Sequence, residues 1–233
     1  MLKKQILLYY HHVGNASPDS RYQRMFVSQS ILNLHIKFLK SLNYFFTTVS
    51  DLRNHPDKKC AAITFDDGYT DNLTMGLPVL NHYNIPATLY VITHDVGKKN
   101  LKWNESGNAE SVDLLTWQEL KILQDHGWEI GSHSSEHVHH DQMDDRGQRI
   151  LINKSFLDLA ENLGTRNRSF CYPYGSYNHL TLQVLKDLNI QTAVTTKAQS
   201  NGHSLELPRV SLYGQRVDHI PTSLAKIAWA LKS

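Results

Sequence analysis

The chain of 233 residues has little cysteine, no long apolar run and almost no excess of charge of either sign. Its two cysteines, Cys60 and Cys171, lie far apart, so no disulfide framework can be inferred. No apolar stretch approaches the roughly 18 residues that a membrane span requires. The 24 basic residues face 22 acidic ones without forming a basic stripe, so we expect no nucleic-acid partner.

The N-terminal stretch "MLKKQILLYYHHVG" begins with charge and continues with a short apolar run. The run is about six residues long, too short for a secretion signal, and no small-residue cleavage site follows it. We therefore expect a cytoplasmic protein, or a secreted or periplasmic one if a leader has been removed. Residues 219–231 carry an apolar stripe, with Lys226 inside the segment and Lys232 directly after it. We expect this segment to pack on the domain, with peripheral membrane contact as the less favoured alternative.

Strand-like and helix-like segments alternate along the whole chain. Short apolar runs predict strands at 6–9, 45–49, 60–65, 87–92, 128–131, 169–172, 191–194 and 207–210. Apolar residues at helical spacing predict helices around 31–42, 73–80, 120–123, 152–163, 180–188 and 220–231. Such alternation is typical of crossover units in a parallel sheet. We predict one α/β domain over residues 1–233, a distorted or incomplete barrel of about seven parallel strands.

Four polar stretches fall where predicted strands end. Tyr10–His12, Asp66–Asp67, His133–His137 and Pro173–Gly175 each follow an apolar run. In parallel barrels the functional side chains gather at the carboxyl ends of the strands. One ring of loops could therefore hold all four stretches.

Two of these stretches together indicate a metal site. His133 and His137 are four residues apart, so one helical turn would place both imidazoles on the same side. Two histidines and one carboxylate form the three-ligand set of a catalytic metal site, with His139 and His140 as rival ligands. A cation would neutralise one carboxylate of Asp66–Asp67 and leave the other free as a base. Alternatively, the two aspartates point in opposite directions, as neighbours on a strand do.

These stretches resemble the polysaccharide deacetylases of carbohydrate esterase family 4, the NodB-homology domain. Thr64–Gly68 (TFDDG) matches the first motif of that family, His133–His137 (HSSEH) the second and Phe170–Gly175 (FCYPYG) the third. The resemblance covers most of residues 5–215, and the motifs occur in a specific order. Tyr10–Val13 is similar to the branch of poly-N-acetylglucosamine deacetylases whose motif order is circularly permuted, so that a histidine comes first.

The resemblance implies a metal-dependent hydrolase that releases acetate from N-acetylhexosamine residues of a glycan. It also implies a divalent cation, most often Zn²⁺, with Co²⁺, Ni²⁺ or Fe²⁺ as alternatives. Three side chains would hold this cation, namely Asp67, His133 and His137. Asp66 would be the general base, His11 the general acid, and the backbone N–H of Tyr174 would stabilise the oxyanion.

The chain departs from the family pattern at two places, and both concern the base. Many relatives have an arginine two residues before the proline of the third motif, where this chain has Cys171. Relatives also carry an Asp-x-x-Asp-Trp motif, where this chain has Leu207–Arg209. We predict that Arg209 supplies the missing guanidinium to Asp66, the alternative being a surface salt bridge. We expect Cys171 to be a buried, inert thiol and not a metal ligand.

Several residues near the motifs are candidates for contacting a sugar. Aromatic rings offer a flat apolar face with a polar edge, although ordinary packing is the alternative for each of them. The candidate substrate contacts are Tyr69, Trp103, Tyr172, Pro173, Tyr174 and Tyr177. The polar stretch 95–113 is either a rim of the substrate site or a surface loop.

Two other functions remain open from the sequence. The chain could hydrolyse another, non-peptide amide in the cytoplasm. It could also be a catalytically impaired relative that only binds glycans, for which the missing arginine and the altered fourth motif are the sole support.

Overall fold

The structure of the protein is a computed structural model that describes residues 4–18, 20–102, 111–165, 168–197 and 203–232. Within these residues, nine strands form one parallel sheet. They are β1 (Gln5–Tyr10), β4 (Phe45–Phe46), β5 (Cys60–Phe65), β6 (Thr88–Val91), β9 (Glu129–Ser132), β10 (Ser169–Cys171), β11 (Thr192–Thr195), β12 (Leu207–Pro208) and β13 (Val210–Ser211). Their order in the sheet is β12-β11-β10-β9-β6-β5-β1-β13, with β4 beside β5.

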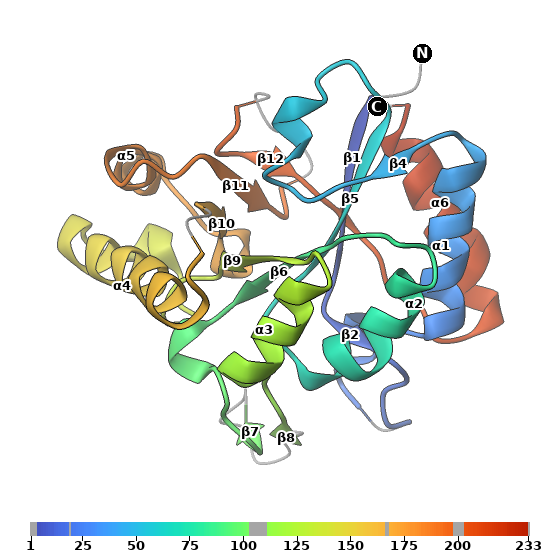
Figure 1. Cartoon of the computed structure of the whole chain (residues 1–233), viewed down its shortest axis with the longest axis horizontal. Helices are drawn as coiled ribbons and strands as arrows, with labels where there is room; N and C mark the ends of the chain where they lie inside the picture. Colours follow the sequence, from blue (N-terminus) through green and yellow to red (C-terminus); the bar gives the residue numbers. More distant parts are fainter. Residues whose placement is uncertain (1–3, 19, 103–110, 166–167, 198–202, 233) are drawn as a thin grey trace.

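The two edges of this sheet are consecutive in the sequence. Strands β12 and β13 lie at opposite ends of the sheet order, and only Arg209 separates them along the chain. The sheet therefore curves until its edges nearly meet, which confirms the predicted incomplete barrel (Figure 1). The prediction of one continuous strand over 207–210 was wrong, because the chain leaves one edge and joins the other at Arg209.

Two small sheets flank the barrel. Strand β2 (His12–Val13) pairs in parallel with β3 (Phe26–Val27), directly after β1. Strand β7 (Leu101–Lys102) pairs antiparallel with β8 (Ser111–Val112), inside the polar stretch 95–113. Trp103, a predicted sugar contact, lies outside the described residues.

The predicted helices are present and surround the sheet (Figure 1). They are α1 (Gln29–Ser41), α2 (Leu77–Asn81), α3 (Trp117–Asp125), α4 (Asp145–Leu163), α5 (His179–Asp187) and α6 (Ile220–Ala230). A capping box at Thr116 and Glu119 begins α3, and Gly164 ends α4 in the left-handed conformation, with φ 63°. Helix α6 packs against α1 and β13, as expected. Among the described residues, no helix is both long and apolar enough to cross a bilayer.

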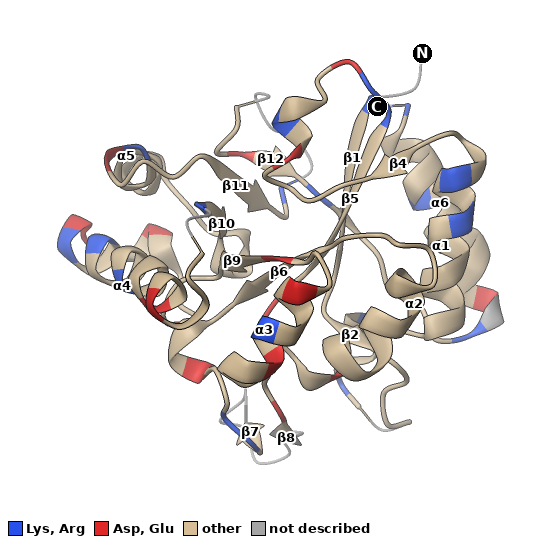
Figure 2. Ribbon diagram, viewed as in Figure 1, with Lys and Arg blue, Asp and Glu red and all other residues tan. Residues whose placement is uncertain are grey.

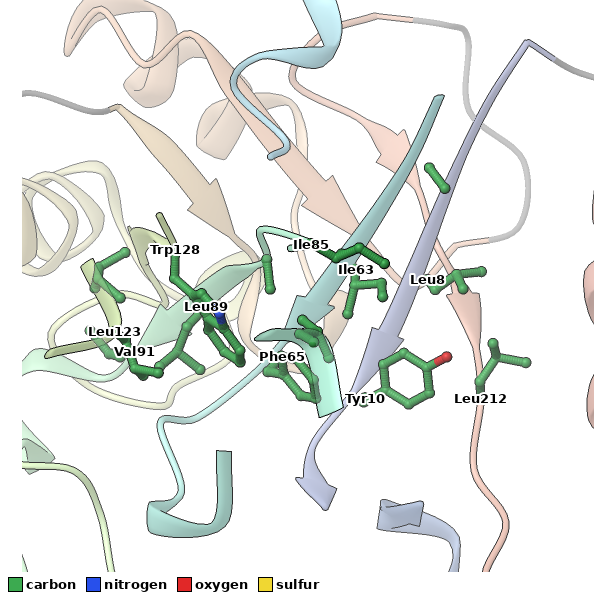
Figure 3. Packing of buried hydrophobic residues seen from close by; sticks show 14 of the residues in the cluster. Leu8, Tyr10, Ile63, Phe65, Ile85, Leu89, Val91, Leu123, Trp128 and Leu212 are labelled. Carbon is green, nitrogen blue, oxygen red and sulfur yellow. The ribbon is translucent and has the colours of Figure 1, made fainter. Parts of the chain in front are cut away.

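The core shows why β5 has no polar face. Its successive side chains point to opposite sides of the sheet, and both sides are covered. Ile63 and Phe65 belong to the core between the sheet and the helices, whereas Cys60 and Ala62 belong to a smaller cluster. In Figure 3, Phe65 lies between Tyr10 and Trp128, with ring centroids 5.6 Å and 5.2 Å away. The strand end that carries the two aspartates is thus anchored firmly.

Candidate active site

The four polar stretches lie at the same end of the barrel. His11 follows β1, Asp66 follows β5, His133 follows β9 and Tyr172 follows β10. These strands are parallel members of one sheet, so their carboxyl ends share one edge. The predicted ring of loops is therefore present.

The two aspartates of the first motif both face this ring. Asp66 continues the line of β5, whereas Asp67 has a positive φ of 74° and Gly68 follows with φ 88°. The left-handed backbone at Asp67 breaks the alternation of a strand, so both carboxylates reach the same site. The alternative that the two side chains point in opposite directions to cap separate elements is not what the structure shows.

Asp66 is held by Arg209, as predicted. The guanidinium donates from Nη1 to Oδ1 and from Nη2 to Oδ2, both at 2.7 Å. The arginine side chain is fully buried, which excludes the alternative of a surface salt bridge. Burial would raise the pKa of the Asp66 carboxyl, but the guanidinium outweighs burial and holds the pKa at about 2. Asp66 is therefore ionised at neutral pH.

Cys171 lies beside this pair. Its sulfur is 3.1 Å from Nη2 of Arg209, and burial raises the pKa of the thiol well above its usual value. Its sulfur and atoms of Asp66 and His133 lie within 4.8 Å of one another, a spacing that could hold a metal. However, both oxygens of Asp66 already accept from Arg209, and the thiol is protonated at neutral pH. This set is the weaker of two candidate metal sites.

The stronger candidate consists of Asp67, His133 and His137. Oδ1 of Asp67 is buried and has no hydrogen-bond partner, and it lies 3.4 Å from Nε2 of His133 and 3.7 Å from Nε2 of His137. Ligand atoms about 2.0–2.1 Å from one tetrahedral zinc ion would be about 3.3 Å apart. The observed separations are close to this value and long for hydrogen bonds. The three residues therefore fit a shared cation.

Neighbouring groups orient these ligands. Nδ1 of His133 donates to the backbone carbonyl of Cys171 at 2.8 Å, which leaves the lone pair of Nε2 directed at Asp67. Burial, and then the nearby His133, lower the pKa of His137 to about 4, so its imidazole is neutral at pH 7. The neutral imidazole is the form that binds metals. The hydroxyl of Tyr69 donates to the Asp67 carboxylate.

The predicted helical turn over His133–His137 was wrong. These residues form an irregular loop in which Ser134 has φ 68°, and the loop geometry brings the two imidazoles together. The rival ligands do not join the site. His139 stacks on Tyr174 at 4.1 Å, and His140 is fully buried outside both donor groups found among the described residues.

His11 lies in a loop that is held by two polar residues, Asp71 and Asn72, which follow the first motif. Nδ2 of Asn72 donates to the carbonyl of His11 at 2.7 Å. Oδ1 of Asp71 accepts from the N–H of Val13 at 2.9 Å, and Oδ2 lies 2.6 Å from Nδ1 of His12. These bonds fix the backbone at His11 and directly after it. Sequence reasoning missed Asp71 and Asn72, because polar residues at the start of a helical segment are ordinary there.

The charge of His11 depends on opposing influences. Burial lowers the pKa of its imidazole, whereas the carboxylates of Asp67 and Asp66 raise it. A lowered pKa makes the imidazolium a stronger acid and reduces its population at neutral pH. His11 is therefore close enough to both carboxylates to feel their charge.

The third motif forms a tight turn, η6 (Pro173–Gly175), in which Tyr174 has φ 58°. Backbone N–H groups in the first turn of a helix have no partner within the helix, so the N–H of Tyr174 is suited to donate to an external oxygen. The Tyr174 ring is 57% exposed and lies 4.3 Å from the ring of His137. A Cβ on Gly175 would lie 2.0 Å from Oγ1 of Thr196, so the turn requires this glycine.

Most of the predicted sugar contacts are not exposed. Tyr172 is buried, its hydroxyl donates to the carbonyl of Leu205, and its ring stacks on Tyr177 at 4.4 Å. The amino group of Lys197 lies 3.9 Å from the centre of the Tyr177 ring. Burial corrects the expectation of sugar stacking for Tyr172, whereas Tyr177 is half-buried and its contact with a sugar stays a prediction.

Two further candidates are corrected for the same reason. Tyr69 is 2% exposed and its ring stacks on His12 at 3.6 Å, so it supports the metal site instead. Pro173 is buried within its turn. Among the described candidates, only Tyr174 presents a largely exposed ring beside the metal ligands.

Comparison with known proteins agrees with this site. A family described as polysaccharide deacetylase matches residues 53–193, more than half of the chain. The chain belongs to this family. The matched segment contains the double aspartate, the two histidines of the candidate metal site and the third motif, whereas His11 and Arg209 lie outside it.

Individual relatives are more distant. The Bacillus subtilis protein YxkH, named after the same family, is 27% identical over 82% of this chain, which spans 64% of that protein's length. The poly-β-1,6-N-acetyl-D-glucosamine N-deacetylase of Staphylococcus aureus is 25% identical, over 92% of this chain and 81% of its own. The solved structure of the Streptococcus pyogenes deacetylase PplD superposes with a TM-score of 0.79 at 24% identity, over the full length of both chains. This last similarity shows the fold.

Proposed function

We propose that this protein hydrolyses the N-acetyl group of N-acetylhexosamine residues in a glycan and releases acetate. One observation carries the proposal. A buried, unpartnered oxygen of Asp67 faces two imidazole nitrogens, directly beside a carboxylate that Arg209 keeps ionised. This combination of an open metal site and a separate base is what hydrolysis of an amide requires.

Zn²⁺ is the cation that we propose for the site. Two neutral imidazoles and one carboxylate are a typical catalytic zinc set, which leaves a position open. Co²⁺, Ni²⁺ and Fe²⁺ accept the same ligands and are the alternatives. A divalent cation supplies Lewis acidity toward water and toward the carbonyl oxygen of the substrate.

Asp66 is the proposed general base. It is ionised, it adjoins Asp67, which would be a metal ligand, and both of its oxygens are held by Arg209. Only a deprotonated group can accept a proton from water. A carboxylate with a pKa of about 2 does not retain that proton for long, so Asp66 returns to its ionised form after the reaction.

His11 and Tyr174 complete the proposed set. The His11 imidazole would donate a proton to the leaving nitrogen, and the clamp from Asn72 fixes its position. The N–H of Tyr174 would donate to the oxygen that becomes negative in the transition state. The Tyr174 ring covers one side of His137 and is exposed enough to contact a sugar.

Acetate release from N-acetylglucosamine oligomers with β-1,4 and β-1,6 linkages tests the proposal. The zinc-loaded protein should release acetate, and Asp66→Asn and His133→Ala should each abolish the release. Asp57→Asn is the matched control, because Asp57 forms only an exposed ion pair with Lys4 and should leave activity unchanged. Near-normal activity of either site variant would contradict the assigned roles.

The same assay separates the proposed function from the two alternatives. Release of formate, or hydrolysis of small amides without any glycan activity, would identify a different amide hydrolase. Glycan binding without acetate release by the zinc-loaded protein would identify a binding module.

A further inference from the structure

A pocket lies between the N-terminal half of α6, the turn η1 (Gln23–Met25) and the segment that follows β13. Its volume is about 320 Å³. Its lining residues are Gln23, Arg24, Tyr213, His219, Thr222, Ser223 and Lys226. None of these seven residues carries a carboxylate, and three of them are basic or contain an imidazole. The pocket belongs to no element of the proposed catalytic site.

Two unneutralised cations flank one ring in this pocket. The guanidinium carbon of Arg24 lies 6.0 Å from the centre of the Tyr213 ring, and Nζ of Lys226 lies 4.3 Å from it. Neither side chain forms an ion pair with any residue that the structure describes. Asp218 is the nearby acidic residue in the sequence, but it pairs with Arg216 and does not line the pocket. The positive charge in the pocket is therefore not compensated.

One neutral group of the pocket, the imidazole of His219, offers a donor as well. Nδ1 of His219 accepts a hydrogen bond from the backbone N–H of Gln215 at 3.2 Å. In the neutral imidazole the proton must then lie on Nε2, which becomes a donor. Gln215 itself is fixed, because its side-chain amide donates to the carbonyl and to Oε1 of Gln23 at 2.9 Å and 2.8 Å. The donor character of His219 is thus built into the fold.

The pocket lies at the end of the barrel that carries the proposed catalytic residues. Ser211 of β13 is paired with Tyr9 of β1, and the N–H of Leu212 donates to the carbonyl of Tyr9. Tyr213 therefore follows the carboxyl end of β13 at the same edge of the sheet where His11 follows β1. Figure 2 shows Lys and Arg positions on the neighbouring helices α1 and α6.

We propose that this pocket binds an anionic group, a carboxylate or a phosphate, that belongs to the substrate glycan. Arginine and lysine side chains bind both groups through charge-assisted hydrogen bonds. The inference rests on the proposed function, and it adds that the glycan carries a negative charge near the N-acetyl sugar. Lys226 donates to the backbone carbonyl of Ser211, a neutral group, so a neutral polymer would leave both positive charges uncompensated.

Binding of three probes to the zinc-loaded protein tests the inference. The probes are neutral chitotetraose, the carboxylate-bearing tetrasaccharide of hyaluronan, and inorganic phosphate. We expect the hyaluronan tetrasaccharide to bind more tightly than chitotetraose, and Lys226→Gln and Arg24→Gln each to reduce this preference about fivefold, as expected for one partly exposed ion pair. Lys37→Gln is the matched control, because it removes a lysine charge from α1 outside the pocket and should leave the preference unchanged.

The outcomes separate this inference from the proposed function. A preference for the acidic glycan that persists in both pocket variants would overturn the inference, since the anion would then bind elsewhere, for example at the metal. Phosphate that binds in the pocket as tightly as the acidic glycan would also overturn it, since the anion need not belong to a sugar. Acetate release from chitotetraose should be unchanged in both variants, and its absence in the unaltered protein would contradict only the proposed function.

Discussion

Removing the Arg209 guanidinium should strongly destabilise the protein. The Asp66 carboxyl is 4% exposed and both of its oxygens accept from Arg209 at 2.7 Å. Its pKa of about 2 lies nearly two units below the ordinary value, which corresponds to about 2.5 kcal/mol at pH 7. Breaking a buried ion pair on one side leaves an uncompensated charge and typically costs about 3–5 kcal/mol. We expect Arg209→Met to lower the free energy of unfolding by about 2.5–5 kcal/mol.

Urea unfolding of the zinc-loaded protein at pH 7 measures this loss. Arg209→Lys should fall between Arg209→Met and the unaltered protein, because an ammonium keeps the charge but cannot donate to both oxygens in the same planar geometry. Arg149→Met is the control. Arg149 pairs with Asp145 and Asp187 at a partly exposed site, and a pair of this kind contributes up to about 1 kcal/mol.

A loss below about 1 kcal/mol for Arg209→Met would refute the reasoning. It would mean that the buried pair stabilises no more than an exposed one, and that Asp66 is stabilised by other groups. Acetate release gives a second readout. Both Arg209 variants should lose activity, because Asp66 would no longer be held away from the metal ligands.

Three further predictions concern single residues. Asn72→Ala removes the hydrogen bond to the His11 carbonyl and should lower kcat about tenfold with unchanged zinc content, because small misplacements of a catalytic group have effects of this size. An unchanged kcat would contradict the role of Asn72 in positioning His11. Burial lowers the pKa of His35 to about 4, below its unfolded value, so the contribution of His35 to stability should fall by about 3 kcal/mol as the pH drops from about 6.5 to 4. His35→Gln should show a shallower dependence in urea unfolding at several pH values. Gly175→Ala should lose about 1–3 kcal/mol, because its Cβ would overlap Thr196, and an unchanged urea midpoint would show that the turn adjusts.

The fold was largely predictable because its signals are local. The uninterrupted apolar run Cys60–Phe65 is a strand with the predicted bounds, buried on both faces of the sheet. The capping box at Thr116 and Glu119 and the terminal Gly164 each depend on a few neighbouring residues. Propensity and periodicity act over such distances, so they can be recognised without the tertiary structure.

The errors arise where distant segments decide the conformation. The loop at His133–His137 is irregular although its spacing is typical of a helical turn, because its imidazoles turn toward Asp67. The run Leu207–Val210 looks like one strand, but the closing barrel places its halves on opposite edges. Spacing along the chain carries no information about either contact.

The sequence by itself determined the order of strands and helices, the placing of polar residues at strand ends, and the motifs that identify the family. Only the tertiary structure decided which of those polar residues meet. Asp67 lies near two imidazoles, and Asp66 near Arg209, because the sheet brings together strand ends that are far apart along the chain. It also decided that Tyr69 and Tyr172 are buried, since the exposure of a ring is a property of what packs around it and not of its own chemistry.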